Sequence, residues 1–315
     1  MKILLTGSSG IIGKNLAKTL RAYGHIVTTH SLRDCWGPYQ ENIDFSLIDW
    51  HYLLRDIDVV IHLSAFAHSC FRLSPHNISQ IYSLNTIASL QLALHSAIFG
   101  VKKFIYFSTS NICDSQSSLS SNCFPSLKQS ASSLYADSKY KSEQFISTLA
   151  EHYPSTNYAI IRPSLVYGPT CKGNFKILLR LLSLPLPLPL KSLRFKRNFI
   201  YIENLSHVIH EMCCRDRLEH LTYDAFDTDQ PCFGEFLDLI SKELHRKSLI
   251  FPVNPILSSL ILKVLRLSPL LSRVLTSSPG DRESLYTLLD IDQPITTREA
   301  VHLTARVWKR KSASL

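Results

Sequence analysis

The 315-residue sequence predicts an α/β fold with a doubly wound parallel sheet, and three observations lead to that prediction. Short apolar segments alternate with longer segments whose apolar residues have helical spacing, as in successive βαβ units. The apolar segments are continuous, which is typical of strands covered on both faces. Hydrophobic residues make up 45% of the chain and charged residues 19%, so a large core is expected and a disordered chain is excluded.

The expected elements can be followed in order along the N-terminal half. The predicted strands cover residues 2–6, 25–29, 59–63, 103–107 and 158–162. The predicted helices cover residues 11–23, 78–99 and 138–151. Gly100 directly follows the second helix, where a glycine commonly ends a helix because it tolerates a left-handed backbone.

The pattern changes after Pro163, and we expect a domain boundary there. A strand is predicted at 199–202, a helix at 204–215, and only short elements interrupted by prolines beyond them. The run containing Pro185, Pro187 and Pro189 predicts an extended segment. The sequence therefore predicts a dinucleotide-binding domain at 1–163 and a smaller substrate-binding lobe at 164–315. We expect a strand near 222–226 to return to the main sheet.

The charge of the chain is positive, with 34 Lys and Arg residues against 25 Asp and Glu and a net charge of +9. This balance is typical of an ordinary basic protein, and it would equally attract a polyanionic ligand such as a nucleotide-sugar. The densest basic runs, 194–197 and 309–311, are short, so no nucleic-acid partner is expected. The eight cysteines form no Cys-x-x-Cys pair, which favours reduced thiols in a cytoplasmic protein over disulfides or a metal site.

No membrane-spanning segment or signal peptide is expected. The N-terminal apolar run meets a glycine turn at once, and no stretch of 18 apolar residues occurs. The apolar region at 249–275 is interpreted as core helices in preference to a peripheral membrane contact.

The glycine turn after the first strand is the first functional motif. Gly7, Gly10 and Gly13 permit a tight turn, close approach of the backbone to a pyrophosphate, and close packing of the helix on the strand. The positive end of the helix would face the phosphates. The motif predicts a Rossmann-type domain that binds a dinucleotide, and its predicted contacts are Gly7, Ser9, Gly10, Ile11, Ile12 and Gly13.

The residues after the second strand bear on the choice between NAD and NADP. NAD sites usually carry an acidic residue there for the ribose hydroxyls, whereas this chain has Ser31 and Arg33. A hydroxyl and a guanidinium favour the 2′-phosphate of NADP(H). Asp34 is close enough to act as a displaced acid, so NAD(H) remains open.

Tyr135 and Lys139 stand four residues apart, on one face of a helix. A nearby ammonium stabilises a phenolate and should lower the pKa of Tyr135, which would make it an acid/base at neutral pH. The same spacing also occurs in ordinary surface pairs. Ser108, Thr109 and Ser110 follow the strand that ends at Phe107, where open α/β sheets place ligands and where loop capping is equally common.

Further motifs occur in order along the chain. They are the 58–65 segment DVVIHLSA, Asn85, the 162–169 segment RPSLVYGP and the 197–205 segment RNFIYIENL. With the glycine turn, Ser108-Thr109 and the Tyr135/Lys139 pair, they resemble an extended short-chain dehydrogenase/reductase of the NAD-dependent epimerase/dehydratase family over nearly the whole chain.

This resemblance implies roles for individual residues. Tyr135 would be the acid/base at the sugar, Lys139 would bind the nicotinamide ribose and depress the Tyr135 pKa, and Thr109 would be the catalytic hydroxyl. The other implied cofactor contacts are Asp44, Leu63, Ala65, Ala67, Asn85 and Pro163. Arg197 would pair with the diphosphate of a UDP-sugar substrate, and Asn174 would also contact the nucleotide. Family members are often dimers through a helix that corresponds to 138–151.

The two residues after Thr109 reduce the number of reactions that the chain could catalyse. Dehydratases of this family carry an Asp-Glu pair there, whereas this chain has Ser110 and Asn111, which argues against dehydration. Cys113 and Asp114 also replace the usual Tyr-Gly. The proline-leucine run at 185–190 resembles a bacterial subgroup that acts on UDP-N-acetylhexosamines in surface-polysaccharide synthesis. That subgroup includes 4-epimerases and NADPH-dependent 4-keto-sugar reductases, and both remain open. A nucleotide-binding regulatory protein without turnover is the alternative of another class.

Overall fold

The computed structural model describes most of the chain in two compact units. The described residues are 1–31, 48–66, 75–110, 112, 131–170, 174–183, 197–229, 231–244 and 283–313. One unit comprises Met1–Pro163 and Val208–Asp224, and the other comprises Ser164–His207 and Ala225–Leu315. We call them unit 1 and unit 2.

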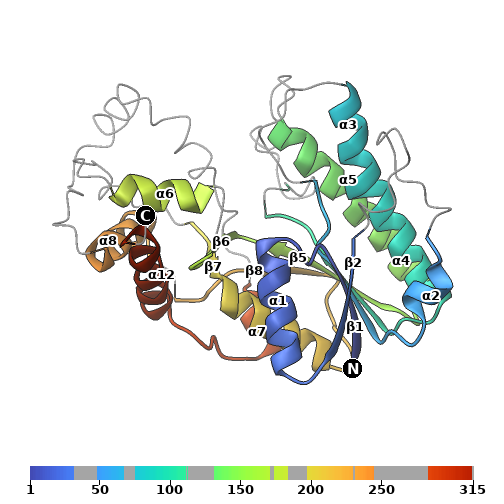
Figure 1. Ribbon diagram of the computed structural model, residues 1–315. Helices are drawn as coiled ribbons and strands as arrows, with labels where there is room; N and C mark the ends of the chain where they lie inside the picture. Colours follow the sequence, from blue (N-terminus) through green and yellow to red (C-terminus); the bar gives the residue numbers. More distant parts are fainter. Residues whose placement is uncertain are drawn as a thin grey trace. The chain divides into compact units, whose positions relative to one another are not determined.

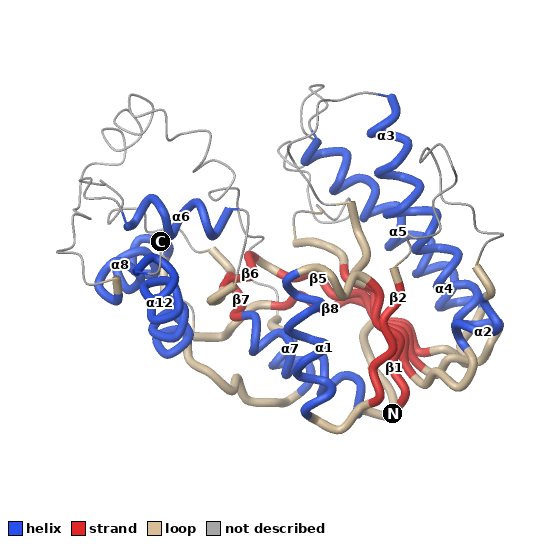
Figure 2. The backbone as a smooth tube through the Cα atoms, viewed as in Figure 1, coloured by secondary structure: helices blue, strands red, loops and turns tan. Residues whose placement is uncertain are grey.

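Unit 1 is built on a six-stranded sheet with the order β2-β1-β3-β4-β5-β8 (Figures 1 and 2). Its strands are β1 (Lys2–Thr6), β2 (Ile26–His30), β3 (Val59–His62), β4 (Lys103–Phe107), β5 (Asn157–Pro163) and β8 (Thr222–Ala225). All pairs from β2 to β5 are parallel. The central strands β3 and β4 are buried along their whole length, because continuous apolar runs fit a sheet covered on both faces.

Helices cover both faces of this sheet. The helices α4 (Ala88–Ile98) and α5 (Ala131–His152) cover one face, and α1 (Ile11–Ala22) and the end of α7 (Ile202–Cys214) cover the other (Figure 1). The short α2 (Trp50–Leu54) packs beside α4, and α3 (Pro75–Tyr82) beside α5. The predicted α/β fold with a doubly wound parallel sheet is therefore confirmed.

The order of the strands reverses between β1 and β3. From β1 the chain proceeds to β2 on one side, and it then returns to place β3 on the other side. Thr6, the last residue of β1, is in register with His30 and His62, the last residues of β2 and β3. In open α/β sheets ligands bind outside the carboxyl ends of the strands at such a switch point, so this edge is where a site is expected.

Unit 2 contains a two-stranded parallel sheet of β6 (Leu165–Tyr167) and β7 (Phe199–Tyr201). Its helices are α6 (Asn174–Ser183), α8 (Phe233–Glu243), α11 (Leu285–Leu289) and α12 (Thr297–Ala313), and α7 begins in this unit. The core is aromatic: the rings of Phe199 and Phe236 stack 4.1 Å apart, and Tyr167 meets Phe236 edge-on.

Three predictions differ from the observed structure by more than one or two residues at an element's ends. The helix expected at 78–99 contains a π-helical turn, η3 (Ser83–Ile87), and the helix expected at 138–151 begins already at Ala131. Beyond residue 215 the prediction of short elements was wrong, because α12 has 17 residues. The helix was not predicted because most of its residues are polar. Its buried face is narrow and consists of Ala300, Val301, Thr304 and Ala305. The proline run at 185–190 and the apolar region at 249–275 lie outside the described residues.

Across the described ranges, every helix is too short or too polar to cross a membrane.

Candidate active site

The glycine turn brings the end of β1 close to the loop after β3. Gly7 has a φ of 72°. A Cβ at Gly7 would lie 2.6 Å from the Ser64 nitrogen and 2.7 Å from the Leu63 carbonyl carbon. A Cβ at Gly13 would lie 2.4 Å from the Gly7 oxygen, so α1 packs on the turn at a distance that only glycine allows. A larger residue at Gly7 would force the glycine turn and the loop after β3 apart, and one at Gly13 would push α1 away from the turn.

The first turn of α1 fits an anionic group. Gly10 is the N-cap residue, is exposed, and provides no side-chain cap for the first amide groups of the helix. No acidic residue occurs in this turn, where Ile11 and Ile12 follow the exposed Ser9 and Gly10. Uncapped amides at the positive end of a helix bind phosphate groups. These residues therefore fit the pyrophosphate of a dinucleotide.

Asn85 fixes the loop that faces the glycine turn. Its amide oxygen accepts a hydrogen bond of 2.6 Å from the Phe66 nitrogen, and its amide nitrogen donates to the Ser138 hydroxyl at 3.0 Å. The side chain lies within the π-helical turn and is fully buried. Asn85 was predicted among the cofactor contacts; the structure uses its amide to hold the loop of Leu63 and Ala65 against α5.

Tyr135 and Lys139 both lie on α5, one turn apart. Lys139 is buried, and its ammonium donates to the Phe107 carbonyl at 2.7 Å and lies 4.4 Å from the centre of the Tyr106 ring. Tyr135 is partly buried, and its carbonyl accepts a hydrogen bond from Ser138. The contact with Phe107 fixes Lys139 directly beneath the start of the loop that carries Thr109.

The charge states of this pair differ from the prediction. Burial raises the pKa of Tyr135 to about 12, whereas we expected Lys139 to lower it. The reason is that Lys139 is buried as well, which lowers its own pKa to about 7 despite the nearby Glu143 carboxylate. A half-ionised ammonium that donates to a main-chain carbonyl offers little charge to the phenolate.

A buried ion pair between Arg162 and Glu143 lies next to Lys139. The sequence analysis gave neither residue of the pair a role. The Arg162 guanidinium binds both Glu143 oxygens, at 3.0 and 2.5 Å, and both side chains are buried. Glu143 lies one helical turn beyond Lys139, so the three charged groups form one cluster. The four-residue spacing of Lys139 and Glu143 on a helix was the only available signal for it.

His62 is a second unassigned residue, at the end of β3. Its ring is fully buried and its pKa is lowered to about 3, mainly by burial and also by the charge of Lys139. The neutral ring is joined to the Thr6 hydroxyl at 2.6 Å and to the Ser89 hydroxyl at 2.8 Å. Because Ser89 donates to the Asn85 carbonyl, it accepts from His62 Nε2, and Thr6 donates to Nδ1. A hydrogen-bond chain therefore links β1 to Asn85.

Thr109 lies in the loop after β4 and is partly exposed. The loop is held by β5, because the Ser108 nitrogen donates to the Ile161 carbonyl at 2.7 Å and the Ser110 nitrogen to the Pro163 carbonyl at 3.3 Å. The structure thus places Thr109 and Pro163 on two adjacent strand ends, at the same edge as the glycine turn.

The remaining predicted site residues are spread over both units. Ser31 is exposed directly after β2, and Leu63 and Ala65 are partly exposed after β3. Arg197 belongs to unit 2; it is buried just before β7, which lowers its pKa to about 10. Asn174 is the first residue of α6. Arg33, Asp44 and Ala67 lie outside the described residues, as do Asn111 and the side chain of Asn174.

Comparison with known proteins identifies a family whose model matches this chain and relatives with a similar sequence or fold. The model of the NAD dependent epimerase/dehydratase family matches residues 3–220. The UDP-glucose 4-epimerase of Vibrio cholerae is 27% identical over 318 aligned residues, which cover 97% of this chain and 95% of that epimerase.

Two solved structures match nearly the whole chain. The UDP-N-acetylglucosamine 4-epimerase of Bacillus cereus superposes with a TM-score of 0.66 at 18% identity, covering 98% of this chain and 99% of its own. RMD from Pseudomonas aeruginosa, solved with NADPH, superposes with a TM-score of 0.64 at 15% identity and the same two coverages. At these identities the two structures support the fold alone.

Proposed function

The chain belongs to the NAD-dependent epimerase/dehydratase family and is an enzyme, and from that premise we propose that it acts at C4 of a UDP-hexose or UDP-N-acetylhexosamine. The observation that carries the proposal is the contact of Lys139 with the Phe107 carbonyl. It brings the Tyr135 helix to the loop of Thr109, at the edge of the sheet where the glycine turn lies. The proposed setting is the synthesis of surface-polysaccharide precursors.

Each site residue has a separate task in this mechanism. Tyr135 would take the proton of the sugar C4 hydroxyl and return it, and Thr109 would hydrogen-bond the same oxygen. Lys139 would bind the ribose hydroxyls of the cofactor. When bound at this edge, a nicotinamide supplies the acceptor and donor of the C4 hydride. Because burial raises the pKa of Tyr135 to about 12, proton removal depends on positive charge brought to this edge.

We favour a 4-epimerase, in which the hydride returns to the sugar from which it came. The support is the UDP-glucose 4-epimerase of Vibrio cholerae, which aligns with this chain over 95% of its own length. An epimerase regenerates its oxidised cofactor in each cycle, so the purified protein should retain NAD⁺. Mass spectrometry of the denatured protein should then detect NAD⁺ without any addition.

The decisive experiment compares Tyr135→Phe with the parent enzyme. Interconversion of UDP-glucose with UDP-galactose, or of the corresponding N-acetylhexosamines, should fall by roughly 10²- to 10⁴-fold in the variant, the usual contribution of a general acid/base. Bound nucleotide should stay equal, since the phenol is not needed to hold the pyrophosphate. Turnover that survives in Tyr135→Phe would refute the mechanism, and a parent that binds nucleotide without any turnover would favour a regulatory role.

A 4-keto-sugar reductase using NADPH is the second candidate, and the residues after β2 favour it. From Ile26 through Arg33 the chain carries no carboxylate that could hold the ribose hydroxyls of NAD, and Ser31 is exposed. Arg33→Ala should then weaken NADPH binding far more than NADH binding, measured by fluorescence titration. Equal losses for both cofactors would remove the case for a 2′-phosphate site.

A further inference from the structure

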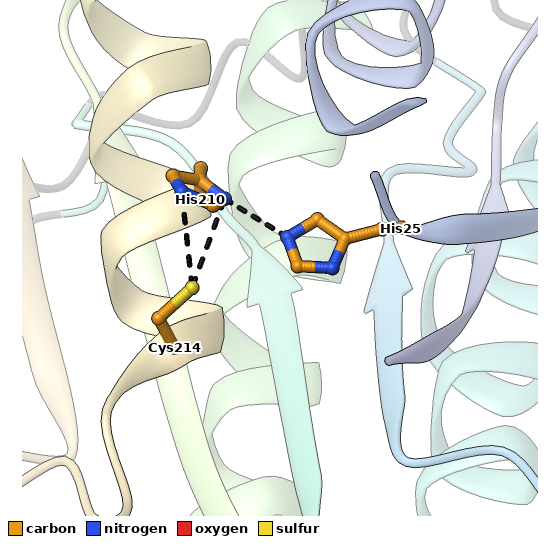
Figure 3. A group of neighbouring side chains, drawn as sticks. All are labelled: His25, His210 and Cys214. Carbon is orange, nitrogen blue, oxygen red and sulfur yellow. Dashed lines mark hydrogen bonds between the residues drawn. The ribbon is translucent and has the colours of Figure 1, made fainter. Parts of the chain in front are cut away.

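Three side chains that commonly bind metals meet at the amino end of the unit 1 sheet. His25 immediately precedes β2, and His210 and Cys214 lie one turn apart on α7 (Figure 3). One ligand atom from each residue lies within 4.8 Å of the others. His25 and His210 are 185 positions apart in the sequence, so only the fold brings them together.

Two of the three distances between these atoms are close to those of a tetrahedral zinc site, and the third, from His25 to Cys214, is at most 4.8 Å. His25 Nε2 and His210 Nδ1 are 3.0 Å apart, and Cys214 Sγ lies 3.8 Å from His210 Nδ1. Zn–N bonds of about 2.05 Å and Zn–S bonds of about 2.3 Å at tetrahedral angles separate two nitrogens by about 3.3 Å and a nitrogen from a sulfur by about 3.6 Å. The two observed distances differ from these values by only a few tenths of an ångström.

The surroundings hold the ring and leave room for a fourth ligand. The Tyr23 ring stacks on His210 with centroids 3.8 Å apart and an angle of 6° between the planes. His210 and Cys214 face the same side of α7 because they are four residues apart, the spacing with which helices present two metal ligands. Cys214 is exposed, so its side chain can turn toward a metal and water can complete the coordination.

A hydrogen bond between the two histidines explains part of this arrangement. It accounts for the 3.0 Å contact of His25 with His210. The Cys214 sulfur lies 3.8 Å from both nitrogens of the His210 ring, at the distance of a weak thiol hydrogen bond (Figure 3). A metal would explain all three side chains, because nitrogen and thiolate donors together are the set that Zn²⁺ prefers.

We propose that His25, His210 and Cys214 form a Zn²⁺ site with one open position. The sequence analysis favoured reduced thiols over a metal site because the cysteines show no paired spacing, and a site assembled from distant segments has no such signature. The site lies at the amino end of β2, whereas the glycine turn and the loop of Thr109 lie at the carboxyl ends. Zn²⁺ would therefore clamp the start of β2 to α7, and its role is separate from the proposed hydride chemistry.

The first test measures the binding of Co²⁺ and Zn²⁺ to the full chain under reducing conditions and without a polyhistidine tag. Co²⁺ should give the absorption of a tetrahedral site together with a thiolate-to-metal charge-transfer band, and Zn²⁺ should displace it at one equivalent. Cys214→Ser should abolish the charge-transfer band and lower the affinity for Zn²⁺ by more than the roughly 10- to 100-fold that accompanies loss of an outer-shell partner. Cys214 is exposed, so this change leaves the fold intact.

The chain contains thirteen histidines and eight cysteines, so matched controls are needed. Cys232→Ser is the control for sulfur, because Cys232 caps α8 and serine is a preferred N-cap residue. His152→Gln is the control for imidazole, because His152 is exposed at the end of α5. Both controls should bind Zn²⁺ as the parent does, and His25→Gln should not.

Thermal unfolding gives a second readout, since a metal that binds only the folded chain stabilises it. Zn²⁺ should raise the Tm of the parent and both controls by a few degrees, reversibly on chelation, and should leave the Tm of Cys214→Ser and His25→Gln unchanged. Absent binding by the parent, or equal binding by Cys214→Ser and the parent, would overturn the proposal. Neither result bears on the sugar chemistry, which Tyr135→Phe tests separately.

Discussion

Lys139 in unit 1 and Asp227 in unit 2 are both buried ionisable groups, and burial moves both of their pKa values to about 7. The pKa of Lys139 is lowered to that value from 10.5, and the pKa of Asp227 is raised to it from 3.8. At neutral pH each of these groups is therefore partly uncharged in the folded chain, although it would be fully charged in an unfolded chain.

The neighbours of the two groups differ. Lys139 Nζ donates to one main-chain carbonyl, that of Phe107, and lies over the Tyr106 ring. Asp227 accepts hydrogen bonds from the Tyr201 nitrogen at 2.9 Å, from Asn204 Nδ2 at 3.0 Å and from the Tyr286 hydroxyl at 3.4 Å. Two of these donors lie at the junction of β7 and α7, and the third lies in α11.

The difference indicates two uses for a buried charge. Asp227 joins segments that are otherwise far apart in the chain, and its loss leaves several buried donors without an acceptor. An ammonium has three N–H groups, and the main-chain contact of Lys139 uses one of them. A buried group with remaining hydrogen-bonding capacity beside a ligand edge is suited to binding, so Lys139 should matter for activity and Asp227 for stability.

Lys139→Met gives the largest expected effect. Interconversion of UDP-sugars should fall by at least about 100-fold, because the cofactor ribose loses its donor and the contact that holds the Tyr135 helix to the loop of Thr109 is lost. The Tm at pH 7 should stay within a few degrees of the parent, since removing a buried cation also removes the cost of its desolvation.

The matched control is Lys141→Met on the same helix. Lys141 is half-exposed and pairs with Asp137 at 3.1 Å, and an exposed pair of this kind contributes little to stability. This variant should retain its activity and its Tm. Equal activity losses in the two lysine variants would show that the helix, and not the buried ammonium, had been disturbed.

Asp227→Ala should have the reverse profile. Leaving the Tyr201 nitrogen, Asn204 and Tyr286 without their acceptor should cost roughly 2–3 kcal/mol in the free energy of unfolding, measured by denaturant titration. The exposed Asp292, in the same unit, provides the control Asp292→Ala, which should stay within about 0.5 kcal/mol of the parent. A loss of stability as large in Asp292→Ala would mean that Asp227 has no special part in unit 2.

The sequence predicted those parts of unit 1 whose signal is local. The strand at 103–107 was predicted with the bounds of β4, because a short run rich in aromatic and β-branched residues is bounded by polar residues. Gly7 and Gly13 were also recognised, since the tight turn and the close packing of α1 each exclude a side chain.

Features that depend on distant contacts could not be predicted. The first turn of α5, from Ala131, has two serines and no apolar periodicity, so periodicity predicted the helix only from residue 138. The spacing of Tyr135 and Lys139 was the one signal that placed Tyr135 on the same helix. Asn85 holds Phe66 and Ser138, which lie 19 and 53 positions away, and spacing along the chain does not show such contacts. The raised pKa of Tyr135 likewise results from burial, which the sequence does not give.

The pH dependence of stability gives the smallest effect and separates the two groups most directly. Between pH 3.8 and about 7 Asp227 is protonated in the folded chain and ionised in the unfolded chain, so its contribution to stability falls as the pH rises through this window. The neutral His62 ring contributes the opposite slope up to pH 6.5. Between about 7 and 10.5 Lys139 is neutral in the folded chain and charged in the unfolded chain, so stability rises with pH there. Each slope is at most about 1.4 kcal/mol per pH unit.

Two conservative variants should therefore each remove one slope and leave the other. Relative to the parent, Asp227→Asn should make the unfolding free energy rise more steeply between pH 5 and pH 7, because the opposite slope of His62 then stands alone. Lys139→Met should flatten the difference in unfolding free energy between pH 7 and pH 9. Denaturant titrations of both variants and the parent at these three pH values measure the differences. If Asp227→Asn left the difference between pH 5 and pH 7 as it is in the parent, Asp227 would be buried as a carboxylate, and its hydrogen bonds would outweigh its desolvation.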